Sequence, residues 1–114
     1  EEKSRGLADS AFGIVGLETA FPVLYTFLVK KGILSLETLI ERMAIAPRRV
    51  FGIEGGYLKE GQIADLAVLD LKASGNVQPD RFLSKGRSTP FAGLEVQGEN
   101  VMTFVNGKQV YSRR

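Results

Sequence analysis

The chain has 114 residues, of which 44% are hydrophobic and 25% charged, and its net charge at pH 7 is +2. These values are typical of one globular domain and exclude extensive disorder. The longest apolar stretch, 20–29, has only half of the ~20 residues that cross a bilayer, so we expect no membrane span. Nucleic-acid binding is also disfavoured, because no aromatic residues are interleaved with the basic pairs Arg48-Arg49 and Arg113-Arg114.

Histidine and cysteine are both absent from the sequence. Without cysteine the chain can form neither a disulfide framework nor a thiolate metal site, which fits a cytoplasmic protein. Without histidine it lacks the commonest zinc ligand and the usual general acid or base near neutral pH. The chain also opens with Glu1 rather than Met and shows no secretory signal, so we expect it to continue a longer chain.

The first predicted elements are a long loop and an apolar helix. Residues 1–18 are rich in glycine and charge and show no sustained period, which indicates a loop. A helix is expected over 20–31, with Thr19 as N-cap, Pro22 in its first turn and Gly32 after its end. Because this helix is apolar on almost every face, it should have neighbours on more than one side.

Two shorter helices are predicted next. Ser35 can cap a helix over 36–44, whose apolar residues recur on one face. The Ala46-Pro47 pair predicts a boundary, and a separate helical stretch over 48–51 should end at Gly52. We expect helical structure to end there.

The remaining sequence predicts strands. A short apolar run bounded by acids, 64–71, is typical of a strand, and a polar segment follows it to about residue 89. Near the end, 101–105 and 108–111 flank Asn106-Gly107, both of which accept the positive φ of a type I′ turn. The chain should therefore end in a β-hairpin.

Two pairs of acids could in principle serve catalysis. Glu37 and Glu41 share a helix face, but such a pair is more often a solvated surface, and that interpretation is preferred. Asp65 and Asp70 are expected on one strand, where their odd spacing directs them to opposite faces. We expect these two to bind turn amides rather than share a proton.

Two glycine-containing segments, 12–16 and 52–56, invite comparison with phosphate-binding loops. Neither has the required glycine spacing, and no helix follows the second. The first could let its backbone approach a ligand closely, because glycine has no side chain. From the residues alone, a structural turn remains the preferred interpretation of both segments.

Three stretches resemble known enzymes. The run from Phe12 through Thr26 closely resembles the segment of class I dihydroorotases that follows their last metal-binding strand. The stretch 46–70 is similar to the return from barrel to accessory β-domain across the amidohydrolase superfamily. The stretches 89–93 and 101–108 are similar to dihydroorotases, hydantoinases and allantoinases alike. The resemblance covers nearly the whole chain, and its specificity is concentrated in 12–26.

This resemblance implies an α/β fold, namely the C-terminal fragment of a (β/α)8 metal-dependent hydrolase barrel followed by strands of a small accessory β-sandwich domain. Residues 1–52 would form the closing loop and C-terminal helices of the barrel. Residues 53–114 would form part of the β-domain with its terminal hairpin. The barrel strands themselves would lie outside this chain.

The activity that the resemblance implies is that of a zinc-dependent dihydroorotase, which interconverts dihydroorotate and N-carbamoyl-aspartate in de novo pyrimidine synthesis. Its binuclear zinc ligands and catalytic aspartate would all lie upstream of Glu1, so no catalytic or metal-binding residue is assigned within this chain. What the resemblance places here is a substrate contact at Phe12 and Gly13. There the loop backbone would meet the polar edge of the ring.

Two alternatives stay open. One is a hydantoinase or allantoinase, which the stretch 12–26 disfavours. The other is a non-catalytic, dihydroorotase-like subunit that scaffolds aspartate transcarbamoylase. The partners expected under the leading interpretation are the small-molecule substrate, the N-terminal remainder of the same enzyme, and a second subunit or aspartate transcarbamoylase, all in the cytoplasm.

We predict that the 114-residue chain alone binds no zinc tightly and has no dihydroorotase activity, because it has no imidazole or thiolate and its carboxylates are dispersed. Zinc titration combined with an activity assay checks this prediction. Stoichiometric binding below micromolar concentration, or turnover above background, would contradict it.

Overall fold

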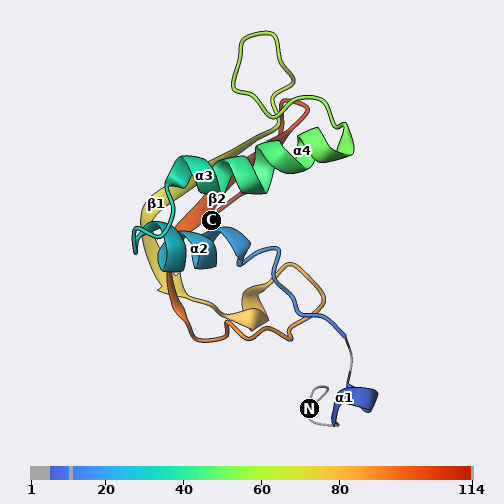
Figure 1. Cartoon of the computed structure of the whole chain (residues 1–114), viewed down its shortest axis with the longest axis vertical. Helices are drawn as coiled ribbons and strands as arrows, with labels where there is room; N and C mark the ends of the chain where they lie inside the picture. The colour runs from blue at the N-terminus through green and yellow to red at the C-terminus, as the bar shows by residue number, and fades with distance from the viewer. Residues whose placement is uncertain (1–5, 11, 114) are drawn as a thin grey trace.

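The computed structural model describes residues 6–10 and 12–113, which form a helical layer against a small antiparallel sheet (Figure 1). The sheet has three strands in the order β1-β2-β3. The elements in chain order are α1 (Gly6–Asp9), α2 (Ala20–Leu24), the π-helical turn η1 (Tyr25–Val29), α3 (Leu36–Ile40), the π-helical turn η2 (Glu41–Ile45), α4 (Ala46–Phe51), β1 (Leu66–Asn76), the 3-10 turn η3 (Pro79–Arg81), β2 (Glu95–Val105) and β3 (Lys108–Ser112). No helix in the described part is long and apolar enough to span a membrane.

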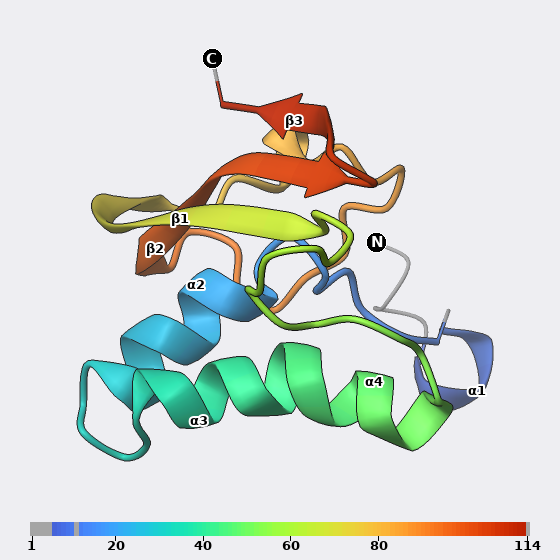
Figure 2. The same ribbon diagram turned by 90° about the horizontal axis from the view of Figure 1, so that it is seen from above.

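Helix α2 lies between the sheet and the rod formed by α3 and α4 (Figure 2). On the sheet side, the rings of Phe21 and Tyr25 stack with centroids 5.7 Å apart. A Cβ at Gly98 of β2 would lie 2.9 Å from Phe21 Cε1 and 3.0 Å from Tyr25 Cδ1, so only glycine fits there. The prediction that this apolar helix has neighbours on more than one side is confirmed.

A polar link joins the same helix to β2. The Thr26 hydroxyl donates to the Pro22 carbonyl oxygen at 2.7 Å and accepts from the Gln97 backbone N–H at 2.7 Å. The Lys30 ammonium also donates to the Gln97 side-chain oxygen. The ring contact and this link together fix α2 and η1 on one strand.

The start of the helical part differs from its prediction in two ways. One helical turn, α1, lies within the segment predicted as a loop, where the Ser10 hydroxyl donates to the Gly6 carbonyl at 2.6 Å; residues 1–5 lie outside the described part. Thr19 takes the N-cap position of α2, but its hydroxyl donates back to the Gly16 carbonyl at 3.2 Å instead of accepting from the helix. At the other end, the positive φ of Gly32 agrees with the predicted stop.

The second and third predicted helices form one continuous rod, so the predicted boundary at Ala46-Pro47 is wrong. The Ala46 N–H donates to the carbonyl of Glu41, five residues back, which widens the turn just before Pro47. Pro47 then lies in the first turn of α4, where its missing N–H is tolerated. The predicted ends of the rod are confirmed: the Ser35 hydroxyl accepts from the Thr38 N–H at 3.1 Å, and Gly52 is left-handed.

The strands are longer than predicted. Strand β1 extends beyond residue 71 into the predicted polar segment, with irregular register between Asp70 and Ser74. The Asp70 carboxylate accepts from the Lys72 and Ala73 N–H groups at 2.9 and 3.1 Å, which satisfies the amides freed by this bulge. The hairpin between β2 and β3 is confirmed, with positive φ at Asn106 and Gly107.

The described residues bury few apolar side chains. Leu39, Val77 and Val96 are the only buried apolar ones among them, with Leu39 at 3% exposure. The radius of gyration is 16.2 Å, compared with about 13 Å for a compact domain of this length. Large exposed apolar side chains include Phe12, Leu17, Val50, Phe51, Leu58 and Leu83. Much of the apolar surface of this chain therefore has no cover within the chain itself.

We predict that the isolated chain self-associates or is partly unfolded. No side chain of α2 or η1 is fully buried, and each large apolar group left uncovered forgoes roughly 1.5–3 kcal/mol. The stability of a domain is only about 5–15 kcal/mol. Light scattering with amide exchange measures the outcome: a monodisperse monomer with strong protection across residues 20–31 would contradict the prediction.

Candidate functional site

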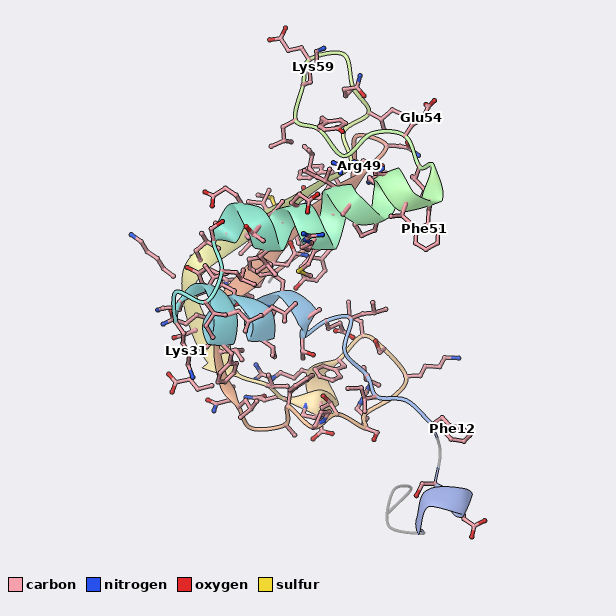
Figure 3. The ribbon with its side chains drawn as sticks, viewed as in Figure 1. Phe12, Lys31, Arg49, Phe51, Glu54 and Lys59 are labelled. Atoms are coloured by element: carbon pink, nitrogen blue, oxygen red, sulfur yellow. The ribbon has the colours of Figure 1, made fainter. Side chains whose placement is uncertain are left out.

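The loop proposed from the resemblance to contact substrate begins at Phe12 and Gly13. The Phe12 side chain is 98% exposed and points away from the rest of the chain (Figure 3). Gly13 has a φ of +80°, and a Cβ built there would meet no other atom within 4 Å. The structure thus places both residues on an open surface, where a backbone that only glycine readily adopts faces outward.

Contacts with the connection between β1 and β2 hold the next residues of this loop. The Val15 N–H donates to the Ser88 carbonyl oxygen at 2.8 Å. A Cβ at Gly86 would lie 2.6 Å from Val15 Cγ2, so the two segments approach closely. The loop is therefore anchored two residues after Gly13.

Glu18 binds the same connection through both carboxylate oxygens. Its Oε2 accepts from the Leu83 N–H at 3.0 Å, and its Oε1 accepts from the Ser84 N–H at 2.9 Å and the Ser84 hydroxyl at 2.7 Å. Partial burial is the largest single influence on the pKa of Glu18 and raises it. The hydrogen bonds from Ser84 and Leu83, with the charge of Arg87, together outweigh burial and lower the pKa from its usual 4.5.

Sequence reasoning missed Glu18, although a signal for it was present. It is the only charged residue between Phe12 and Val29. A single carboxylate in a long apolar stretch needs a reason to be there, because burying an unpaired charge is costly. The donors that satisfy Glu18 lie on a connection 65 and 66 residues further along the chain.

The acid pairs weighed from the sequence have structural roles. Glu41 lies 3.5 Å from Arg42 and 3.8 Å from Arg49 in exposed ion pairs, and Glu37 is exposed, as the solvated-surface interpretation requires. Asp65 lies just before β1, not on the strand with Asp70 as predicted. Its carboxylate accepts from the Asn106 N–H at 2.9 Å, and its other oxygen lies 3.5 Å from Arg48. The expectation that it binds backbone amides is confirmed.

Metal binding does not fit these residues. The sequence contains no histidine or cysteine, and within 6–10 and 12–113 no three Asp or Glu residues gather as a possible metal site. No step of chemistry is therefore assigned to a metal held by this chain.

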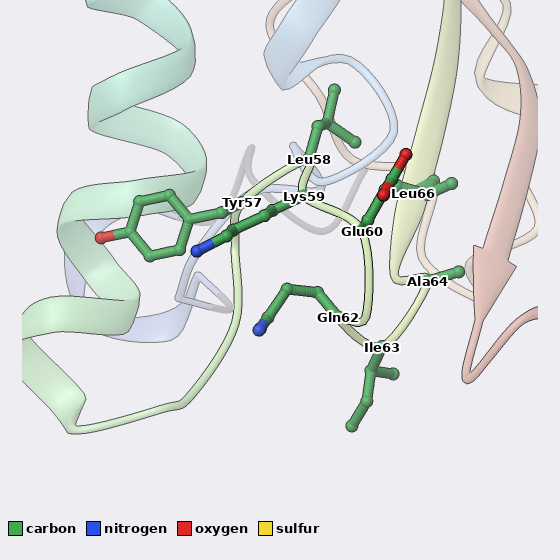
Figure 4. A pocket seen from close by; sticks show the side chains of 8 residues that line it. All are labelled: Tyr57, Leu58, Lys59, Glu60, Gln62, Ile63, Ala64 and Leu66. Atoms are coloured by element: carbon green, nitrogen blue, oxygen red, sulfur yellow. The ribbon is translucent and has the colours of Figure 1, made fainter.

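The two hollows in the described part lie away from the Phe12 loop. The larger, about 230 Å³, is lined by the protruding loop residues Tyr57, Leu58, Lys59, Glu60, Gln62, Ile63, Ala64 and Leu66 (Figure 4). Lys59 and Phe12 lie at opposite ends of the molecule (Figure 3). The 52–56 segment forms a turn beside this loop, where Gly56 packs against Arg48 and the Arg48 guanidinium donates to the Glu54 carbonyl at 2.6 Å.

A family model described as the amidohydrolase family matches residues 6–110. This chain belongs to the amidohydrolase family. A dihydroorotase of Bacillus cytotoxicus is 53% identical over 113 residues, and one of Bacillus thuringiensis is 51% identical. Each match covers 99% of this chain but 26% of the relative, so the chain spans about a quarter of the length of these amidohydrolases.

Solved structures give the same fold. The L-hydantoinase (dihydropyrimidinase) of Arthrobacter aurescens has a TM-score of 0.84 and 40% identity, over 91% of this chain and 24% of that one. A D-hydantoinase also superposes with a TM-score of 0.84, over 92% of this chain and 23% of that one, at 23% identity, which supports the fold alone. The predicted fold class, a portion of an α/β amidohydrolase, is confirmed.

We predict that acid weakens the link between Glu18 and residues 83–84. Because the folded-state pKa of Glu18 is lowered, its stabilisation is complete above the ordinary value of 4.5 and is lost as the pH falls through the folded-state pKa. The effect should be modest, since Glu18 is exposed and solvent screens it. The measurement is amide exchange at Leu83 and Ser84 in the full-length protein, relative to unstructured peptides at each pH. Protection that is independent of pH, or that survives in Glu18→Gln, would contradict it.

Proposed function

We propose that the full-length protein containing this chain is a dihydroorotase. The observation that carries the proposal is the 53% identity to a dihydroorotase over 99% of this chain, compared with 40% to the L-hydantoinase over 91%. Within that span lies the 12–26 stretch, whose resemblance is specific to dihydroorotases. The reaction is the reversible addition of water across the ring amide of dihydroorotate. The ring C–N bond breaks, the carbonyl carbon becomes a carboxylate, and the nitrogen takes a proton as the ureido group of N-carbamoyl-aspartate.

In this proposal the present residues bind and orient the substrate, and residues outside the chain perform the chemistry. The metal, proposed to be binuclear zinc, activates water when bound, and its ligands lie outside these residues. Phe12 and Gly13 present backbone polar groups to the polar edge of the ring. Support comes from the exposure of both residues and from the positive φ of Gly13, which leaves its backbone uncovered by a side chain.

We also propose the division of the chain at residue 52. Residues 1–52 belong to the barrel end, and 53–114 to the accessory β-domain. The two parts then meet where Phe21 and Tyr25 cross Gly98 and where Thr26 binds Gln97. A cytoplasmic location, a role in pyrimidine synthesis, and a homodimer or a complex with aspartate transcarbamoylase are part of the same proposal.

The alternatives are separated by one set of assays on the full-length protein with its metal content measured. Turnover of dihydroorotate in preference to hydantoin and allantoin supports the proposal. Turnover of only hydantoin or allantoin would replace it with the cyclic amidohydrolase alternative. A folded protein that turns over none of them and binds aspartate transcarbamoylase would be the scaffold.

Substituting Gly13 with valine in the full-length enzyme should weaken substrate binding and leave the zinc content unchanged. A β-branched residue at a φ of +80° is strained by about 1–3 kcal/mol, which corresponds to roughly a tenfold loss in kcat/KM if the loop shifts in response. Steady-state kinetics with metal analysis measures both quantities.

The matched control is Gly61→Val. Gly61 has a φ of +82° and the same open space around its Cβ position, but it lies on the 57–63 loop far from Phe12. The control should therefore carry similar strain with unchanged kinetics. Equal kinetics for Gly13→Val and wild type would make the Phe12-Gly13 loop a structural turn only.

A further inference from the structure

The connection between β1 and β2 lies directly against the segment that follows the candidate substrate loop. In Figure 1 the residues near 80–88 run beside the chain leading from residue 12 into α2, and Figure 2 shows the same proximity. Three independent contacts join them: the Glu18 carboxylate with Leu83 and Ser84, the Val15 N–H with the Ser88 carbonyl, and the close approach of Gly86 to Val15. A segment of the β-part of the chain thus supports the loop along residues 15–18.

Glu18 is the one side chain in this contact that binds two successive backbone amides. Each carboxylate oxygen faces a different N–H group, those of Leu83 and Ser84, and Oε1 also takes the Ser84 hydroxyl. Only a carboxylate has acceptors on both branches; the amide of glutamine would place an NH₂ donor opposite one of the two N–H groups. Hydrogen bonds to a charged acceptor are also shorter and stronger than neutral ones.

The geometry does not require Glu18 to touch the substrate. Its carboxylate is engaged with 83–84, whereas the backbone proposed to meet the ring is at Phe12 and Gly13. The loop between them is short, and Val15 is fixed to the same connection. A shift of residues 83–88 would therefore be passed to Gly13 through a few tethered residues.

We propose that Glu18 is a positioning residue, which holds the 83–88 connection against residues 15–18 and so sets the place of Phe12 and Gly13 for substrate. This inference rests on the proposed function, because it concerns the same loop. It adds that substrate affinity depends on a connection in the β-part of the chain, far from Gly13 in sequence.

The test begins with Glu18→Gln in the full-length enzyme. KM for dihydroorotate should rise about tenfold, while kcat and metal content change little, because the loop is displaced but no reacting group is lost. Glu60→Gln is the matched control, since Glu60 is an equally exposed glutamate on the remote 57–63 loop, and it should leave KM unchanged. A purely structural role would instead lower the melting temperature and active fraction without changing KM.

A second variant acts on the same contact without touching Glu18. In Gly86→Ala the new Cβ would press on Val15, from which it would be separated by 2.6 Å, so this variant should also raise KM. The double variant should show less than the product of the two single effects, because both disturb one surface. If Glu18→Gln fails to fold, Gly86→Ala alone decides, and an unchanged KM overturns the proposal.

Amide exchange separates failure of this inference from failure of the proposed function. If the wild-type protein does not turn over dihydroorotate, the proposed function is wrong, and exchange across residues 12–17 becomes the deciding measurement. Faster exchange there in Glu18→Gln than in Glu60→Gln supports a positioning role for the loop. Equal exchange overturns it, as does an unchanged KM in a wild-type background that is active on dihydroorotate.

Discussion

Strand β2 has a glycine where helix α2 crosses it, and this close approach holds the helical and sheet parts of the chain together. A Cβ at Gly98 would collide with the rings of both Phe21 and Tyr25. With the rings seated, Thr26 comes within reach of the Gln97 backbone, and the hydroxyl replaces a hydrogen bond that the strand would otherwise make with water. The candidate loop directly precedes α2, so its position also depends on this contact.

The features predicted correctly from the sequence are those governed by neighbouring residues. The Ser35 cap and the Asn106-Gly107 turn depend on a few adjacent residues, and both are observed. The boundary expected at Pro47 failed because a wide turn before it removed the usual conflict, and periodicity does not reveal such turns. The start of β2 was missed because its first residues pair with a distant, polar stretch of β1.

The candidate site shows the same division between local and distant information. Phe12 and Gly13 were selected through resemblance, since their residues alone indicate no more than a turn. Glu18 lies inside the most specific stretch of that resemblance, yet its partners, Leu83 and Ser84, could not be inferred from spacing. A carboxylate that binds amides far along the chain becomes recognisable only when the fold brings the two segments together.

The link between Thr26 and Gln97 also bears on the order of folding. It closes a loop of 71 residues, whereas the β2–β3 hairpin closes over a two-residue turn. Loop-closure entropy grows with the length of the loop, so contacts between distant residues form after local ones. The hairpin can therefore assemble early, and the helices dock on β2 only after most of this sequence has been synthesised. On this order, the loop carrying Phe12 and Gly13 is near the start of the chain and yet acquires its final shape among the last.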